Sequence, residues 1–214
     1  MRIGVFDSGI GGKSVAIAIQ QALPKHEIIF RDDSFNLPYG TKTISEIRSF
    51  VTPILQDLAP HCDIIVIACN TVSTNLIKEL RHKISVPLIV TEPMVKQAIE
   101  LTKSKVIAVC ATPRTLESSR YGELKAIYAK GIKVIEPDCS DWTSLIEANQ
   151  MNQERINKDI EILCRAGADV IALGCTHYHW IEEEIKHASK GRAEVLQPEM
   201  LIIDELKSKI EQLS

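Results

Sequence analysis

Two cysteines occur in similar surroundings, each directly before polar residues. Cys69 precedes Asn70, and Cys175 precedes Thr176 and His177. Each cysteine follows an apolar run rich in β-branched residues, which is typical of a buried parallel strand. Side chains just after such strands lie at the carboxyl edge of the sheet, where ligands bind in α/β proteins. A histidine two residues from a cysteine could make that thiol a usable base.

The other four cysteines have no polar context and are interpreted as small buried hydrophobes. They are Cys62, Cys110, Cys139 and Cys164. The chain has no C-x-x-C pair, and its cysteines lack the clustered spacing of a structural zinc site. A disulfide framework, a redox motif or a bound metal is therefore not expected.

A glycine-rich segment, residues 9–14, invites comparison with phosphate-binding loops. Asp7 stands where a P-loop needs its first glycine, and Ser14 stands at the third glycine of the dinucleotide fingerprint. The only support for a nucleotide site is Asp32, which lies about where a ribose-binding acid would. The segment instead predicts a turn whose following helix points its amino end at another anion, for example a carboxylate.

Three other polar residues each have a structural and a chemical interpretation. Asp7 could cap the turn after its strand, or it could bind an ammonium group or orient a thiol. His177 could simply begin a helix. Glu147, judged by pattern alone, is a solvated acid on a helix face.

Composition places the chain among ordinary globular proteins. Of its 214 residues, 45% are hydrophobic and 25% are charged, and the formal net charge is -3 with a pI near 6.1. This balance gives no electrostatic case for nucleic acid or an anionic membrane surface. The sequence begins without the apolar segment of a signal peptide and contains no run of membrane-spanning length, so a cytoplasmic protein is expected.

Strands and helices alternate along the chain. The pattern predicts strands at 3–6, 27–30, 63–68, 88–90, 105–110, 132–135 and 169–174. It predicts helices at 14–23, from Thr43, from the Cys69 strand to about Lys83, from Pro93, at 143–164 (mostly helical) and at 200–213. Thr43 and Glu46 form a capping box, and Pro53 should kink or split that helix. Such alternation predicts a parallel α/β architecture, and the similarity of residues 2–7 to 105–110 suggests two related lobes.

Four motifs in order resemble those of glutamate racemases, within the aspartate/glutamate racemase superfamily. They are Asp7-Ser8-Gly9, Pro38-Tyr39-Gly40, Ala68-Cys69-Asn70-Thr71 and Gly174-Cys175-Thr176-His177-Tyr178. The resemblance extends from Ile3 to about the final helix. It implies two similar lobes, each a mostly parallel sheet flanked by helices, with the active site in the cleft between them. The first lobe would comprise residues 1–92 plus 198–214, and the second residues 93–197.

The resemblance also implies a reaction in which two cysteines act on opposite faces of the substrate's α-carbon, without a pyridoxal cofactor or metal. The catalytic residues would be Cys69, Cys175, Asp7, Glu147 and His177. Asp7 and Ser8 would contact the ammonium group and support Cys69, while Glu147 and His177 would support Cys175. The substrate-binding residues would be Ser8, Pro38, Tyr39, Gly40, Asn70, Thr71, Thr112, Thr115 and Thr176.

The activity expected from this resemblance is racemisation of L-glutamate to D-glutamate, which would supply D-glutamate to bacterial cell-wall peptidoglycan. A homodimer is possible. The alternatives are a racemase of aspartate or another acidic amino acid, and a non-catalytic relative that acts as a binding protein. The sequence departs from the family at Lys13, at His179 and in the apolar Phe35 and Leu37, and family members continue beyond the point where this chain stops.

Overall fold

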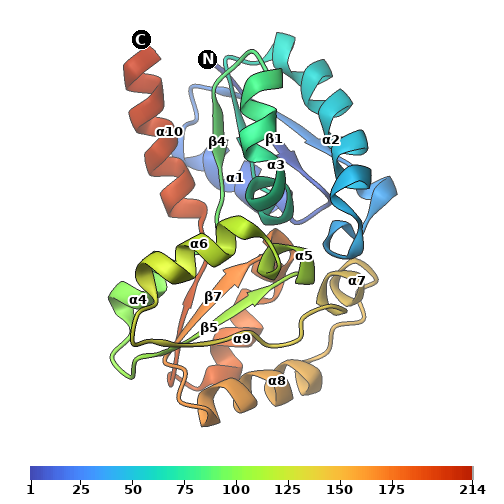
Figure 1. Ribbon diagram of the computed structural model, residues 1–214. Coiled ribbons are helices and arrows are strands. Elements are labelled where there is room, and N and C mark those ends of the chain that lie inside the picture. The colour runs from blue at the N-terminus through green and yellow to red at the C-terminus, as the bar shows by residue number, and fades with distance from the viewer. Residues whose placement is uncertain (214) are drawn as a thin grey trace. The chain divides into compact units, whose positions relative to one another are not determined.

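The computed structural model describes residues 1–213, and these form two compact units. The first contains residues 1–92 together with the chain from Pro198 onward, and the second contains residues 93–197. Each unit holds one four-stranded parallel sheet with helices on both faces (Figure 1). The prediction of two α/β lobes with parallel sheets is confirmed.

The sheet of the first unit has the strand order β2-β1-β3-β4. Its strands are β1 (Arg2–Asp7), β2 (Glu27–Asp32), β3 (Ile64–Ile67) and β4 (Leu88–Val90). Its helices are α1 (Gly12–Ala22), α2 (Ile44–Leu58), α3 (Asn70–Lys83) and α10 (Glu199–Leu213), with 3-10 turns η1 (Ser34–Asn36), η2 (Tyr39–Thr41) and η3 (Ala59–His61).

Strand β3 is apolar throughout because both of its faces are covered. Ile65 and Ile67 pack in the cluster that α2 and α3 cover, whereas Ile64 and Val66 pack in the cluster that includes residues of α1 and α10. Side chains alternate between the two faces of a strand, so a doubly covered strand needs an apolar residue at every position.

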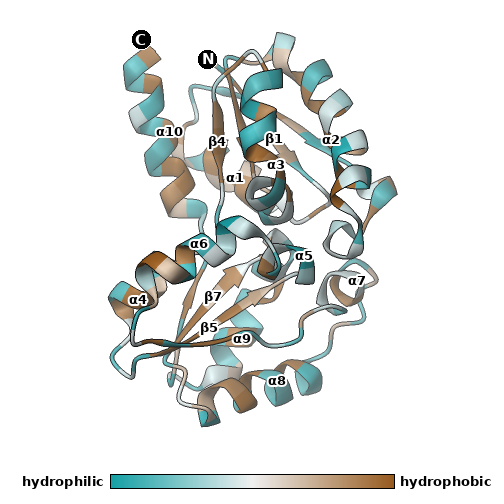
Figure 2. Cartoon of the chain, viewed as in Figure 1, coloured by the Kyte–Doolittle hydropathy of each residue, from teal (hydrophilic) through white to brown (hydrophobic). Residues whose placement is uncertain are grey.

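The second unit repeats this arrangement with the strand order β6-β5-β7-β8. Its strands are β5 (Val106–Ala111), β6 (Lys133–Ile135), β7 (Val170–Gly174) and β8 (Glu194–Leu196). Its helices are α4 (Val95–Leu101), α5 (Pro113–Leu116), α6 (Ser119–Tyr128), α7 (Trp142–Glu147), α8 (Gln153–Arg165) and α9 (Glu182–Ser189), with a 3-10 segment η4 (Thr176–Ile181). Strands β5 and β7 are brown over much of their length in Figure 2, as expected of a doubly covered sheet.

Several boundaries differ from the sequence prediction. Helix α2 has the predicted capping box but runs unbroken through Pro53, so the helix is not split. The polar segment after β5 is the short helix α5, and the helix expected from Pro93 begins at Val95. The helical region 143–164 is two helices, α7 and α8, separated at residues 148–152. Elements α6, α9 and β8 were not predicted, since α6 lacks a clear apolar stripe and β8 has only three residues.

Among residues 1–213, no helix is both long enough and apolar enough to cross a membrane.

Candidate functional site

Cys69 stands where β3 ends and α3 begins. It is the N-cap residue of α3, its side chain is almost fully buried, and its thiol donates a hydrogen bond to Ser8 Oγ at 3.4 Å. Ser8 directly follows β1, the strand that pairs with β3. The two side chains therefore meet at the carboxyl edge of the sheet, as the sequence predicts for residues at adjacent strand ends.

Asn70, the first residue of α3, carries a buried amide without a protein partner. The residue is only 2% exposed, and neither its Oδ1 nor its Nδ2 makes a hydrogen bond. An unsatisfied buried amide is costly, so a ligand that completes its hydrogen bonds would bind favourably here. The amino end of α3 also presents backbone N–H groups, which favour an anion. Asn70 and this helix end, with the buried Thr71 beside them, can hold a carboxylate.

Asp7 organises the loop between β1 and α1. Its buried carboxylate accepts hydrogen bonds from the backbone N–H of Gly9 (3.2 Å) and of Gly12 (2.9 Å). A Cβ added at Gly12 would lie 2.3 Å from the Asp7 Cβ, so only glycine allows this approach. The capping interpretation of Asp7 is confirmed, and its contact with an ammonium group stays a prediction.

The segment around Pro38, Tyr39 and Gly40 is held by a buried carboxylate. Tyr39 Oη donates to Asp33 Oδ2 at 2.5 Å, and Asn36 Nδ2 donates to both oxygens of the same carboxylate. Burial, the Asp33 hydrogen bond and the charges of Asp33, Cys69 and Asp7 all raise the pKa of Tyr39 above its ordinary value, so the phenol stays protonated. Sequence reasoning missed Asp33, although it stands six residues before Tyr39 in a polar strand end.

Cys175 occupies the matching position in the second unit, directly after β7. Its Sγ lies 3.8 Å from His177 Nδ1 and 3.8 Å from Thr143 Oγ1. Thr143 was expected only to begin a helix, and its contact with the thiol was not predicted. The one signal for it was a hydroxyl in the first turn of a predicted helix.

Glu147, the last residue of α7, completes a line of contacts. Its Oε1 lies 2.6 Å from His177 Nε2. An ionised carboxylate only accepts hydrogen bonds, so Nε2 must carry the hydrogen, and neutral His177 then presents the lone pair of Nδ1 to Cys175. The Glu147–His177 pair can therefore take a proton from the Cys175 thiol and return it. The solvated position expected of Glu147 from pattern alone is wrong, because the packing of α7 brings it to His177.

The three predicted substrate-binding threonines of the second unit also lie near the carboxyl edge of its sheet. Thr112 follows β5 and caps α5, accepting the Thr115 N–H at 3.3 Å, and the two hydroxyls are 3.0 Å apart. Thr176 is buried at the start of η4, next to Cys175. Because β5 and β7 are paired with Ala111 opposite Gly174, Thr112 and Cys175 follow adjacent strand ends.

The two thiol sites, one in each unit, are built alike. In the first sheet, Ser8 follows β1 and Cys69 follows the neighbouring strand β3. In the second sheet, Thr112 follows β5 and Cys175 follows the neighbouring strand β7. Each unit thus supplies one buried thiol with hydroxyl neighbours.

The described residues, 1–213, contain neither a candidate metal site nor a disulfide. No group of three or more His, Cys, Asp or Glu side chains in residues 1–213 is arranged to hold a metal ion. No disulfide links the six cysteines, all of which lie in this range.

Comparison with known proteins points to one family. A model of the Asp/Glu/Hydantoin racemase family matches residues 11–204. A glutamate racemase of Clostridium novyi is 34% identical over 95% of this chain and 78% of its own length. The crystal structure of Escherichia coli glutamate racemase with L-glutamate and the activator UDP-MurNAc-ala has a TM-score of 0.90 at 27% identity, covering 98% of this chain and 82% of that one. Francisella tularensis glutamate racemase with D-glutamate has a TM-score of 0.83 at 27% identity, covering 99% and 81%.

Proposed function

Because this chain belongs to the Asp/Glu/Hydantoin racemase family, we propose that it interconverts L- and D-glutamate through two cysteines. It is an amino-acid racemase, an isomerase, as its relatives over nearly the whole chain are. Glutamate is favoured as substrate because those relatives are glutamate racemases, two of them solved with L-glutamate and with D-glutamate.

In the proposed reaction Cys69 and Cys175 act on opposite faces of the same α-carbon. One thiolate takes the α-hydrogen as a proton while the opposite thiol donates its proton to the other face, which inverts the configuration. The enzyme must therefore start with one thiolate and one thiol, and each turnover exchanges these states. The observation that carries this proposal is the line from Glu147 to His177 (2.6 Å) to Cys175 (3.8 Å), which can hold the thiol's proton.

The remaining predicted residues would bind the substrate. Asn70, Thr71 and Thr176 hold the α-carboxylate, and the orphaned Asn70 amide and the amino end of α3 support this role. Backbone groups of Tyr39 and Gly40, after Pro38, hold the side-chain carboxylate.

Asp7 and Ser8 contact the ammonium group and support Cys69. The hydrogen bond from Cys69 Sγ to Ser8 Oγ, at 3.4 Å, supports this role of Ser8. Thr112 and Thr115 line the same pocket. The reaction needs no cofactor, because the acid, the base and the carboxylate binders are all supplied by the chain.

The proposed product, D-glutamate, would enter bacterial cell-wall peptidoglycan. Both thiols must stay reduced to work as acid and base, which suits the cytoplasm. A homodimer remains an expectation.

The test is incubation with L-glutamate in deuterated water, followed by circular dichroism and by α-deuterium content. We expect racemisation with deuterium in the product, abolished in Cys69→Ser and in Cys175→Ser. Cys164→Ser is the matched control and should keep full activity, since Cys164 lies in the last turn of α8, which leads into the amino end of β7, whereas Cys175 follows the carboxyl end of that strand.

Three outcomes would contradict the proposal. Absence of deuterium uptake by the folded wild-type protein would favour a binding protein, and faster turnover of aspartate than of glutamate would favour the aspartate alternative. Activity that survives in either cysteine variant would exclude the two-base scheme.

A further inference from the structure

The hydroxyl of Thr143 is a buried polar group beside Cys175 to which the proposed function gives no role. Its Oγ1 lies 3.8 Å from Cys175 Sγ, within hydrogen-bonding range for sulfur, and either atom could be the donor. A threonine hydroxyl has one hydrogen and two lone pairs, so it can donate to only one neighbour at a time.

Tyr178 is a candidate second acceptor for that hydroxyl. The Tyr178 phenol donates its own hydrogen to the Cys139 carbonyl at 3.0 Å, because a carbonyl can only accept. Burial, then the nearby thiol groups of Cys175, Cys139 and Cys110, raise the pKa of Tyr178 well above its ordinary value, and a hydrogen bond with Thr143 works against that rise. A hydrogen bond lowers the pKa of a phenol when it is donated to the phenol oxygen. That direction is the one expected if the Thr143 hydroxyl donates to Tyr178 Oη, whereas the contact that geometry establishes for Thr143 is the one with Cys175 Sγ at 3.8 Å.

Resting on the proposed function, in which Cys175 alternates between thiol and thiolate, we propose that Thr143 is a further catalytic residue whose hydroxyl hydrogen follows that alternation. When Cys175 is a thiol, its S–H can donate to His177 or to Thr143 Oγ1, and Thr143 donates to Tyr178. When Cys175 is a thiolate, which only accepts, the Thr143 hydroxyl rotates about its Cβ–Oγ1 bond and donates to Sγ. No covalent bond of Thr143 changes, and the α-proton of the substrate still goes to sulfur.

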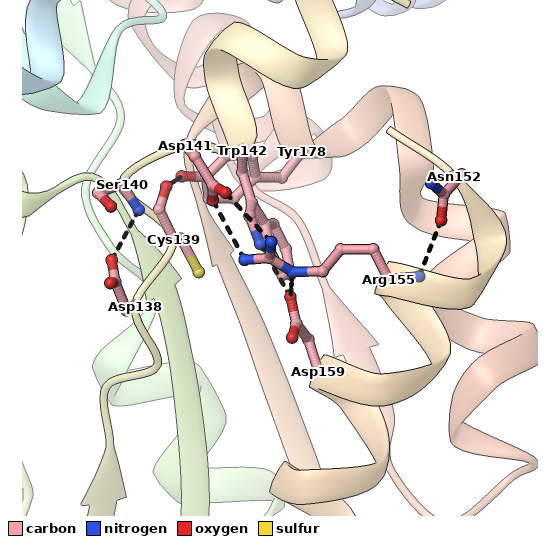
Figure 3. A network of polar contacts seen from close by, with 9 residues as sticks. All are labelled: Asp138, Cys139, Ser140, Asp141, Trp142, Asn152, Arg155, Asp159 and Tyr178. Atoms are coloured by element: carbon pink, nitrogen blue, oxygen red, sulfur yellow. Dashed lines mark hydrogen bonds and ion pairs between the residues drawn. The ribbon is translucent and has the colours of Figure 1, made fainter. Parts of the chain in front are cut away.

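The segment that carries Thr143 is firmly anchored (Figure 3). Arg155 bridges Asp141 (3.1 and 3.3 Å) and Asp159 (2.7 Å), and Trp142 Nε1 donates to the same Asp159 carboxylate. The ring of Trp142 packs edge-on against Tyr178 with centroids 5.1 Å apart. The Arg155 and Asp159 contacts tie the start of α7 to α8, and the ring contact packs it against η4. The 3.8 Å distance from Thr143 Oγ1 to Cys175 Sγ is therefore maintained without help from the Thr143 hydroxyl.

The first experiment removes the hydroxyl while keeping the side-chain shape, in Thr143→Val. Without its donor the Cys175 thiolate is less stable, so the pH midpoint for alkylation of Cys175 by iodoacetamide should rise by about one unit. Peptide mass spectrometry reads this midpoint, with Cys69 of the same molecule as an internal reference that should not move. The kcat for glutamate should fall about 10-fold or more, and Thr143→Ser should restore both values. Thr52→Val is the matched control, since the buried Thr52 hydroxyl has no partner and belongs to the first unit.

The second experiment, Tyr178→Phe, removes the competing acceptor. The Thr143 hydroxyl then has only Cys175 to donate to, so the Cys175 alkylation midpoint should move down, opposite in sign to Thr143→Val. If the substitutions merely loosened the segment around Thr143, the Cys175 alkylation midpoints of the two variants would not shift in opposite directions.

An unchanged Cys175 midpoint in Thr143→Val, or shifts of the same sign in both variants, would overturn the role of Thr143. These results leave the proposed function intact if Cys175→Ser is inactive. An active Cys175→Ser enzyme would instead refute the two-cysteine reaction itself.

Discussion

At the scale of single residues, the candidate catalytic groups differ from ordinary buried residues in their partners. Cys69 and Cys175 are buried, and so are Cys110 and Cys139, so burial alone does not identify a reactive thiol. The distinction lies in the hydroxyl and imidazole groups within reach of the first pair. Chemistry at either cysteine therefore depends on a few polar contacts, each of which one substitution can remove.

The contact between Glu147 and His177 provides a prediction about charge. Glu147→Gln keeps the shape and an acceptor oxygen but removes the negative charge that stabilises a protonated His177. We expect kcat for glutamate racemisation to fall about 10- to 100-fold, with little change in melting temperature. Steady-state kinetics by circular dichroism measures this. Glu154→Gln, an exposed glutamate at the start of α8, is the control, and equal losses in both variants would refute the special role of Glu147.

At the scale of elements, the junctions after strands position the site. The turn between β1 and α1 folds back so closely that the Gly12 backbone donates to the Asp7 carboxylate. That closeness requires glycine at position 12, whereas Gly122 in the middle of α6 has no neighbouring atom within 4 Å of an added Cβ. The structure therefore requires glycine at position 12 but leaves room for a larger residue at position 122.

Gly12→Ala and Gly122→Ala should therefore change stability in opposite directions. The added methyl at position 12 clashes with the Asp7 side chain and should lower the free energy of unfolding by about 1–3 kcal/mol. The methyl at position 122 restricts the unfolded chain and favours helix, which should raise it by about 0.5–1 kcal/mol. Urea denaturation gives both values. A stability of Gly12→Ala equal to wild type would show that the turn can relax without cost.

At the scale of the whole molecule, the chain leaves the first unit at residue 92 and returns to it at Pro198. Helix α10 then contacts α1 and β4, and it buries Ile202, Ile203 and Leu206 in the core beneath them. The first unit therefore depends on a segment that is synthesised after the whole second unit.

Leu206→Ala should destabilise the first unit selectively, by about 2–5 kcal/mol, because it leaves a cavity in that core. Both tryptophans of the chain, Trp142 and Trp180, belong to the second unit, so their fluorescence reports that unit while far-UV circular dichroism reports both. We expect the dichroism transition to shift or split and the fluorescence transition to move less. Leu201→Ala, at a residue 42% exposed on the same helix, is the control. Equal shifts by both probes would mean that the units unfold together.

Most of the fold follows from local sequence. The β-branched apolar runs at 63–68 and 169–174 predict doubly covered strands, and Thr43 with Glu46 predicts the start of α2, because these signals act over a few residues. Short or weakly patterned elements such as β8 and α6 carry little of this signal. They are stabilised by the sheet and the cores into which they pack.

The placement of Cys69 and Cys175 at strand ends was likewise determined by the sequence alone, and so were the hydroxyl and imidazole residues beside them. Only the tertiary structure brought Glu147 to His177 across 30 positions and Thr143 to Cys175 across 32, and left the Asn70 amide buried without a protein partner. Periodicity and capping signals report the conformation of one short segment. A contact between distant segments is decided by how whole helices pack on the sheet, so no local pattern contains it.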